Sequence, residues 1–280
     1  MRRFSLRNNL GEARFLNLES GLFLSNPQGL GINRAYSFTD GENGFFACVQ
    51  DANEPRQQIT GDLIFTGDAY AEYLDLIQWM QKTDAMEFVY QPEERTFYRK
   101  VNLSSVSKSE LQQGGYLSCQ IVWNCLTPWY RENPVSVDLS FETTGEIKAY
   151  SYAYPYRYRQ SNAAGSVELL SQGQLDGAIR ILLHGPCNDP TIMLKDAVGN
   201  LIGQTTLDIT LTASDTLELS TLPTDETLLV NGVDRCDLLD PSENVFVRLP
   251  HGQSCFLTVD TEAGEGCSAR VYAYDYYRGV

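Results

Sequence analysis

The sequence has few of the residues on which catalysis near neutral pH usually depends. Only two histidines, His184 and His251, occur in 280 residues, and neither lies in a hydrolase, zinc-protease or other nucleophile motif. The 36 acidic residues allow many carboxylate pairs, but a glycosidase assignment depends on the separation of two carboxylates in space, which a sequence does not give. We therefore expect no catalytic residues, no cofactor and no enzymatic activity.

Basic residues and long apolar runs are also scarce. The chain has 21 Lys and Arg against 36 Asp and Glu, a net charge of −15, and no basic cluster. Broad binding of nucleic acid needs a basic face, so this composition excludes it. No run approaches the roughly 18 apolar residues of a membrane-spanning helix, and the N-terminus lacks the apolar region of a signal peptide. We expect no membrane partner and assembly in the cytoplasm.

The cysteines follow no disulfide framework. There are seven, at positions 48, 119, 125, 187, 236, 255 and 267, so we expect reduced and mostly buried thiols. The stretches "HGPC" and "HGQSC" place Cys187 after His184 and Cys255 after His251. If the two loops met, the four side chains would form a ligand set suited to zinc. We favour the interpretation without a metal, because a His-Gly turn before a small buried cysteine needs none.

One segment has the periodicity of a long helix. The stretch "GDAYAEYLDLIQWMQKTDA" has apolar residues at helical spacing, and Asp68 is placed as its N-cap. The face that we expect to be apolar consists of Tyr70, Tyr73, Leu74, Ile77 and Met80.

Most of the remaining sequence alternates with a period of two or breaks at turn residues. In "YLSCQIVWNC" the residues Leu117, Cys119, Ile121, Trp123 and Cys125 fall on one face of a strand. Many short strands separated by Gly, Pro, Asn and Asp favour a mainly β protein, an antiparallel sandwich or barrel with one helix in the first half.

A domain boundary is expected near "TPWYRENPVS", because Pro128 and Pro134 interrupt strand pairing and the composition changes there. Residues 1–134 have 12 basic and 16 acidic residues, whereas residues 135–280 have 9 and 20, so the second half carries most of the negative charge. All three tryptophans lie in the first half. We therefore expect one domain over 1–134 and another over 135–280.

Two stretches repeat tyrosine at every second position. "KAYSYAYPYRYRQ" contains Tyr150, Tyr152, Tyr154, Tyr156 and Tyr158, and "RVYAYDYYRG" contains Tyr272, Tyr274 and Tyr276. In an extended strand such residues share one face. Three interpretations are open: rings that cover a sheet face with their hydroxyls in solvent, a contact surface with another domain or subunit, or a platform for stacking sugars.

The order of several motifs gives a resemblance that covers residues 20–280. In the first half the order is "NPQGLG", "ITGDLIFTG", "YAEYLDLIQWM", "MEFVYQPEERTFYRKVNLSSVSKSE" and "YLSCQIVWNCLTPWYR"; in the second half it is "AIRILLHGPCNDPTIMLKDAVGNLIG", "DTLELST" and "FVRLPHGQSCFLTV". This succession resembles the siphophage distal tail proteins, which close the tail tube and form the hub of the baseplate.

The resemblance implies a fold and an assembly. It implies a first domain like a tail-tube subunit, a split β-barrel with one helix, and a second domain like a galectin β-sandwich. It implies a homo-hexameric ring at the virion tail tip whose partners are the tail tube protein, the tail-tip or baseplate hub protein and receptor-binding proteins. DNA would pass through the ring without specific binding. The alternative is a carbohydrate-binding module for host attachment in the second domain.

On such a ring we expect the subunit contacts at strand edges of residues 20–65 and at the last strand of the first domain. The tyrosine runs sit at the opening and close of the second domain, where first and last strands commonly pair, so we expect them to form one face that packs against the first domain or a neighbouring protein. The interface candidates are Ile59, Phe65, Trp123, Tyr150, Tyr152, Tyr154, Tyr272 and Tyr274.

Overall fold

The computed structural model describes residues 2–40, 47–53, 56–132, 137–140, 142–143, 162–263 and 267–280, and over these it is mainly β with one α-helix, as the sequence predicts. The chain divides into two compact units, one of Met1–Arg131 with Tyr277–Val280 and one of Glu132–Tyr276. The boundary expected after residue 134 falls on 133–136, outside the described residues. The last four residues, which the sequence division placed in the second half, belong to the first unit.

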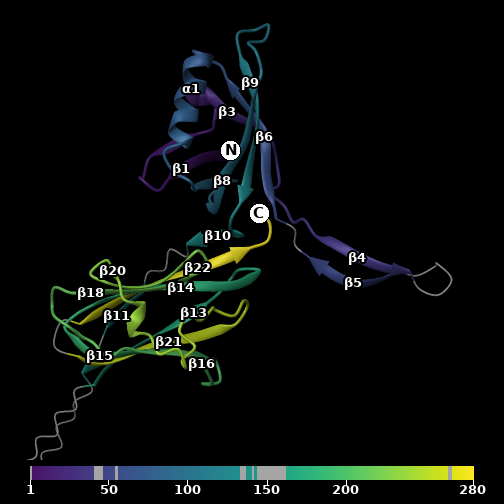
Figure 1. Cartoon of the computed structure of the whole chain (residues 1–280). Coiled ribbons are helices and arrows are strands. Elements are labelled where there is room, and N and C mark those ends of the chain that lie inside the picture. The colour runs from purple at the N-terminus through teal and green to yellow at the C-terminus, as the bar shows by residue number, and fades with distance from the viewer. Residues whose placement is uncertain are drawn as a thin grey trace, which may run out of the picture. The chain divides into compact units, whose positions relative to one another are not determined.

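The first unit is built on antiparallel strands in the order β2-β1-β7-β8-β9-β6-β3, and β10 also pairs with β8 (Figure 1). The strands are β1 (Arg3–Asn8), β2 (Ala13–Phe15), β3 (Leu22–Gln28), β6 (Gln58–Phe65), β7 (Met86–Gln91), β8 (Phe97–Lys108), β9 (Leu117–Cys125) and β10 (Trp129–Glu132). A 3-10 helix, η1 (Leu18–Ser20), connects β2 to β3.

Strand β8 joins the two halves of this sheet. Its first part pairs with β7 up to Val101, and its second part, from Val101 to Lys108, pairs with β9. The register shifts between Leu103 and Ser105, which is the irregularity of a β-bulge and bends a strand. The sheet can therefore fold around a single core.

Strand β9 supplies the middle of that core. Its five alternate residues from Leu117 to Cys125 are buried, as the period of two predicts, and Trp123 is 0% exposed. Trp123 meets Phe88 of β7 edge-on, with ring centroids 5.4 Å apart, and Trp129 meets the same Phe88 ring at 6.0 Å. Large rings thus fill the space between the two halves of the bent sheet.

The helix α1 (Ala69–Met80) begins as the sequence predicts, and its buried face agrees in part with the expected one. Asp68 is the N-cap and its side chain accepts a hydrogen bond from the Ala71 amide at 3.4 Å. Tyr70 and Leu74, expected on the apolar face, are exposed. The buried residues are Ala69, Leu76, Trp79 and Met80, and Tyr73 and Ile77 of the expected face are partly buried against the same core.

Strands β4 (Ala35–Asp40) and β5 (Ala47–Asn53) form an antiparallel hairpin. Across the described part of the chain they pair with each other and with no other strand (Figure 1). The hairpin comes after the stretch "NPQGLG", where Gly29 has φ +82°. A Cβ at Gly29 would lie 1.9 Å from the Gln58 carbonyl oxygen, so only glycine lets the chain leave β3 this close to β6.

The second unit consists of two antiparallel sheets. One has the order β22-β14-β18-β19-β20 with β11 also on β22, and the other has the order β12-β13-β21-β15-β16 with β17 on β15. The strands of the first sheet are β11 (Val137–Ser140), β14 (Leu175–His184), β18 (Thr216–Leu222), β19 (Asp225–Val230), β20 (Val233–Asp234) and β22 (Ser268–Tyr277). Those of the second are β12 (Glu142–Thr143), β13 (Asn162–Leu170), β15 (Cys187–Asp196), β16 (Leu201–Thr206), β17 (Thr210–Leu211) and β21 (Ser254–Ala263), and a 3-10 helix, η2 (Cys236–Leu238), comes after β20.

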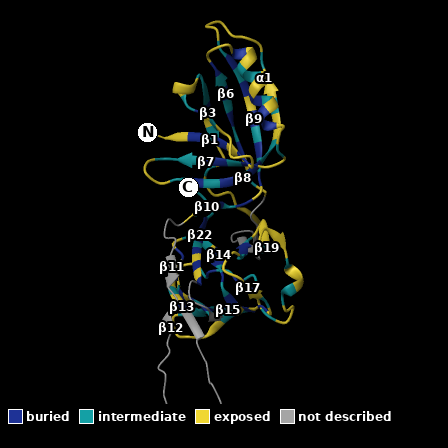
Figure 2. Ribbon diagram, turned by 90° about the vertical axis from the view of Figure 1, so that its left-hand side faces the viewer, coloured by how far each residue is buried: buried dark blue, intermediate teal, exposed yellow. Residues whose placement is uncertain are grey.

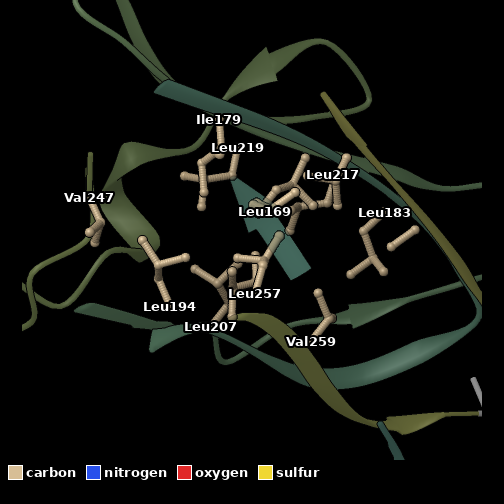
Figure 3. Packing of buried hydrophobic residues seen from close by; sticks show 14 of the residues in the cluster. Leu169, Ile179, Leu183, Leu194, Leu207, Leu217, Leu219, Val247, Leu257 and Val259 are labelled. Atoms are coloured by element: carbon tan, nitrogen blue, oxygen red, sulfur yellow. The ribbon is translucent and has the colours of Figure 1, made fainter. Parts of the chain in front are cut away.

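The two sheets enclose an aliphatic core. Ile179 and Leu183 of β14 lie above Leu257 and Val259 of β21, and Leu219 comes from the neighbouring β18 (Figure 3). Buried residues alternate with less buried ones along β14 and β18 of one sheet and along β15 of the other, which is the pattern of a sandwich with one face of each sheet in the core. None of the helices in the described residues is long and apolar enough to cross a membrane.

Candidate functional site

A groove of about 300 Å³ lies beside η1 in the first unit. We call it the η1 groove, and its lining residues are Arg2, Arg3, Phe4, Leu16, Asn17, Leu18, Glu19, Phe23 and Leu24. Leu18 is 70% exposed, and Phe15, which lines an adjoining hollow together with Arg3 and Asn17, is 60% exposed. Two large apolar side chains therefore stand in solvent at one place on the first unit.

Backbone hydrogen bonds fix this exposed corner. The Phe4 amide donates to the Asn17 side-chain oxygen at 3.1 Å, and the Leu24 amide donates to the Leu16 carbonyl at 3.3 Å. Gly21, at φ +75°, closes η1. Leu16, which precedes η1, and Leu24, which follows it, are both buried. The turn that carries Leu18 is therefore anchored at both ends, and this anchoring holds Leu18 at the surface.

The groove is basic in an acidic protein. Arg2 and Arg3 line it, and the Arg2 guanidinium lies 5.8 Å from the centroid of the Phe4 ring. Further along, Arg7 and Arg14 are paired with Glu87 and Asp75, whereas Arg2 and Arg3 have no ion-pair partner among the described residues. Against a net charge of −15, this corner is suited to an acidic and apolar partner surface.

Two strand edges flank the groove. In the described residues β2 pairs only with β1, and β3 pairs with no strand other than β6. The first residues of β3 also bond to the chain just before η1, since Leu22 bridges to Asn17 and the Leu24 amide donates to Leu16. From Ser25 onwards the outer side of β3 has backbone groups without a neighbouring strand in this part of the chain. Such edges can pair with a second polypeptide.

The candidates Ile59, Phe65 and Trp123 lie elsewhere. All three are 0% exposed, in the core of the first unit. Their strands β6 and β9 each have a strand on both sides, so neither offers a free edge. Within residues 20–65 the edge belongs to β3, and the assignment of these three side chains to a subunit contact stays a prediction.

Tyr272 and Tyr274 lie on one face of β22, turned away from the aliphatic core, because Val271 and Ala273, which alternate with them, belong to that core. The Arg180 guanidinium lies 5.9 Å from the Tyr272 ring centroid and pairs with Glu218 at 2.6 Å. Tyr274 is 8% exposed, and burial raises its pKa.

On one side of these tyrosines runs β14, which pairs Arg180 with Tyr272 and Ala178 with Tyr274. Strand β11, the first described strand of the second unit, pairs with β22 from Ser268 to Val271. Tyr150, Tyr152 and Tyr154 lie outside the described residues. The expectation that the two tyrosine runs pair stays a prediction.

The four residues considered as metal ligands are not brought together. His251 lies beside the start of β14, where its Nδ1 is 2.8 Å from Asp176, whereas His184 is the last residue of that strand. Eight residues of extended chain separate the two positions, a distance of roughly 26 Å. The hydrogen bond from His251 also lowers the pKa of Asp176. The described residues contain no cluster of three or more potential metal ligands.

Phe15, Leu18 and the arginines beside them are not among the candidates that the sequence pattern marks. The available signal was local charge: the first 14 residues contain Arg2, Arg3, Arg7 and Arg14 and a single acid, Glu12, in a strongly acidic chain. That asymmetry marks a basic surface on the first strand.

The comparisons with known proteins agree with this architecture. Residues 3–126 match the model of the distal tail protein N-terminal domain. Over these residues, which lie in the first unit, the chain belongs to the distal tail protein family as its N-terminal domain. No curated protein matches it in sequence.

Two solved structures share this fold over 96% or more of the chain. A chain of the phage P2 baseplate in its activated conformation with calcium has a TM-score of 0.68 at 16% identity, and all of both chains is covered. The distal tail protein of phage SPP1, described as a paradigm of the hub adsorption apparatus of phages that infect Gram-positive bacteria, has a TM-score of 0.59 at 12% identity, with 96% of this chain and 98% of that chain covered. Distal tail and hub proteins are structural parts of the virion tail tip.

Proposed function

We propose that this distal tail protein has no catalytic step and forms a hexameric ring that joins the tail tube to the tail-tip or baseplate proteins and to receptor-binding proteins. The observation that carries the proposal is the likeness in fold, over the whole length of both chains, to a subunit of a phage baseplate. The first unit, which matches the distal tail N-terminal domain, forms the ring, and the second unit is carried by it.

The η1 groove and the outer edge of β3 form one side of the contact between neighbouring subunits. Phe15 and Leu18 supply apolar surface, and burial of each is worth about 1.5–3 kcal/mol. Arg2 and Arg3 supply positive charge to a neighbour that is acidic overall. A ring contact joins two different patches, so the same face need not be self-complementary.

The acidity of the chain sets a condition on this ring. Six copies, each with a net charge of −15, repel one another, and salt at physiological strength screens that repulsion beyond about 8 Å. Apolar burial and edge pairing must outweigh what remains. The same acidity lets DNA pass through the channel, because a wall poor in Lys and Arg does not hold phosphates.

The test is the oligomeric state of the purified full chain and of two matched variants. At micromolar concentration and physiological salt, the wild type should sediment as a hexamer and appear in negative-stain electron microscopy as a six-fold ring with a central hole. Leu18→Glu places a charge in the proposed contact and should weaken association at least about tenfold, since 1.4 kcal/mol is a factor of ten.

Val198→Glu is the control. Val198 is 86% exposed on the second unit, so the same kind of change there should leave the ring intact. A wild type that stays monomeric under these conditions contradicts the ring. A ring that forms equally well with Leu18→Glu retains the hexamer but removes the η1 groove from its contacts.

Carbohydrate binding by the second unit is the second candidate. It is favoured by Tyr272, a partly exposed ring flanked by the paired Arg180 and Glu218, since sugars are bound by an aromatic face with polar groups beside it. Loss of binding to cell-wall polysaccharide in Tyr272→Ser, with the ring unchanged, would support it. Equal binding by wild type and variant would exclude this site.

A further inference from the structure

Two cysteines from different sheets meet at one end of the second unit. Cys187 is the first residue of β15, and Cys267 directly precedes β22. The connection from β14 to β15 and the connection from β21 to β22 both cross from one sheet to the other. Register places them side by side, because His184 pairs with Ser268 and Cys187 pairs with Ala263.

Both thiols are buried at the same end of the unit. Cys187 is 2% exposed and Cys267 is 9% exposed, and both belong to the aliphatic core of the unit. Each thiol is the largest influence on the pKa of the other, and both thiols are free. Neither residue takes part in the proposed ring contact, so the chemistry of this pair is independent of the ring.

We propose that Cys187 and Cys267 are an oxidisable dithiol that forms a disulfide between the two sheets of the second unit when the protein meets a peroxide. The cross-link would close a loop of roughly 80 residues and join β15 to β22 covalently, which stabilises mainly by restricting the unfolded chain. A virion protein made among reduced thiols would gain this constraint outside the cell.

The two thiols have different roles in the reaction. The hydrogen bond from Cys267 lowers the pKa of Cys187, and the Thr261 hydroxyl contributes to the same effect. The same contact, with burial, raises the pKa of Cys267. Cys187 is therefore the thiolate that attacks, and Cys267 is the resolving thiol.

The steps balance with hydrogen peroxide as the oxidant. The Cys187 thiolate attacks one peroxide oxygen, the O–O bond breaks, and Cys187 sulfenic acid and hydroxide form. The Cys267 sulfur then attacks the sulfenic sulfur, the S–O bond breaks and water leaves. Overall, two thiols and one hydrogen peroxide give one disulfide and two waters.

The experiment uses the full chain with Cys236→Ala, which removes the one cysteine exposed among the described residues and its intermolecular disulfides. After treatment with hydrogen peroxide, alkylation under denaturing conditions should find two thiols fewer than before. Tryptic peptides 181–195 and 249–270 should be joined and should separate with dithiothreitol. Because 249–270 holds both Cys255 and Cys267, fragmentation must assign the bond to Cys267.

Stability supplies the second measurement. Oxidation should raise the Tm of the second unit by about 5 °C or more, and dithiothreitol should reverse the rise. Cys187→Ala and Cys267→Ala should each abolish both the joined peptides and the rise. Cys255→Ala is the control, because Cys255 is equally buried and burial raises its pKa. This variant should keep both the joined peptides and the rise in Tm. An unchanged thiol count, or a bond that uses Cys255, would overturn the proposal.

Discussion

Both units of this chain have a core enclosed by β-strands, but different kinds of side chain fill the two cores. The first unit fills its core with rings, among them Phe4, Phe65, Phe88, Trp123 and Trp129. The core of the second unit has no ring among its buried residues in the described part of the chain and consists mainly of Leu, Ile and Val. The kind of side chain in each core depends on the shape of the sheets that surround it.

Geometry explains the difference. Two sheets packed face to face lie about 10 Å apart, and interdigitating Leu and Val side chains fill that space. A single sheet that bends around itself, closed by one helix, leaves a space of uneven width. Rings that meet edge-on, as Phe88 does with Trp123, fill such a space with few residues.

The surfaces of the units differ as well (Figure 2). Of the large hydrophobic side chains that are exposed in the described residues, nine lie on the first unit and five on the second. The second unit instead has more carboxylates held by local hydrogen bonds. The first is therefore the better candidate for assembly contacts, and the second for a self-contained carried module.

The largest expected effects come from opening each core. Trp123→Ala should lower the free energy of unfolding of the first unit by about 3–5 kcal/mol, and Leu257→Ala should lower that of the second by about 2–5 kcal/mol, because both side chains are 0% exposed. All three tryptophans lie in the first unit, so tryptophan fluorescence follows that unit alone, while calorimetry follows both.

The comparison between units depends on which unfolding transition each variant shifts. Leu257→Ala should leave the denaturation curve followed by tryptophan fluorescence in place. If Trp123→Ala and Leu257→Ala shift both transitions equally, the units unfold as one cooperative block and the contrast between their cores has no separate energetic meaning.

How far the sequence could predict this fold depends on the element. Strand β9 was predictable because every second residue from Leu117 to Cys125 is apolar and the strand has one buried face. The face of α1 was predictable only in part, since Tyr70 and Leu74 fit a helical periodicity as well as Leu76 and Trp79 do, and only the surrounding sheet decides between them. The return of residues 277–280 to the first unit has no local signal, because it is a tertiary contact.

The proposed site consists of other residues than the interface candidates that the sequence pattern marked. Apolar strand residues such as Ile59 and Trp123 were named as interface candidates, yet alternation alone marks a buried face and not what buries it. Phe15 and Leu18 sit in short irregular elements, where periodicity gives no warning of exposure. Their neighbourhood could be found only through the excess of arginine at the start of the chain.

A smaller effect is expected from the buried charged residue that each unit contains among the described residues. Arg99 donates to the Thr127 carbonyl at 2.8 Å and to the Gln57 side chain at 2.6 Å, and its guanidinium lies 5.4 Å from the Trp129 ring centroid. Asp275 accepts from the Ser171 hydroxyl at 3.1 Å and from the Gln172 amide at 2.9 Å. Arg99→Ala and Asp275→Ala should each cost about 1.5–3 kcal/mol in their own unit.

Arg95→Ala is the control for the first of these variants, because Arg95 is exposed four residues away and its loss should stay within about 0.5 kcal/mol. Equal effects of Arg95→Ala and Arg99→Ala on chemical denaturation would mean that the hydrogen bonds of Arg99 contribute nothing net. Hydrogen-bond geometry would then be no basis for predicting a loss of stability in Asp275→Ala either.

The smallest expected difference is in sensitivity to acid. Hydrogen bonds lower the pKa of six aspartates in the second unit, Asp176, Asp196, Asp215, Asp234, Asp237 and Asp240, but of only two described carboxylates in the first, Glu12 and Glu110. A lowered pKa in the folded state stabilises above the ordinary value of 3.8 for aspartate, and this stabilisation is lost as the pH falls through the folded value. Acidification from pH 7 to pH 3 should therefore lower the Tm of the second unit more than that of the first.

Asp196 isolates this effect at a single residue. Its carboxylate accepts hydrogen bonds from the Val198 amide at 2.9 Å and from the Asn200 amide and side chain at 2.8 Å each, and the Asn200 side chain is the main cause of its lowered pKa. Asp196→Asn should lower the Tm of the second unit by about 1–2 °C at pH 7, and the difference should shrink below pH 4 as the wild-type carboxylate takes up its proton. Asp225→Asn, at an exposed position on the same unit, should leave the Tm unchanged at both values. If the difference in Tm between wild type and Asp196→Asn is the same at pH 7 and pH 3, the side chain of Asp196 stabilises its turn without a contribution from its negative charge.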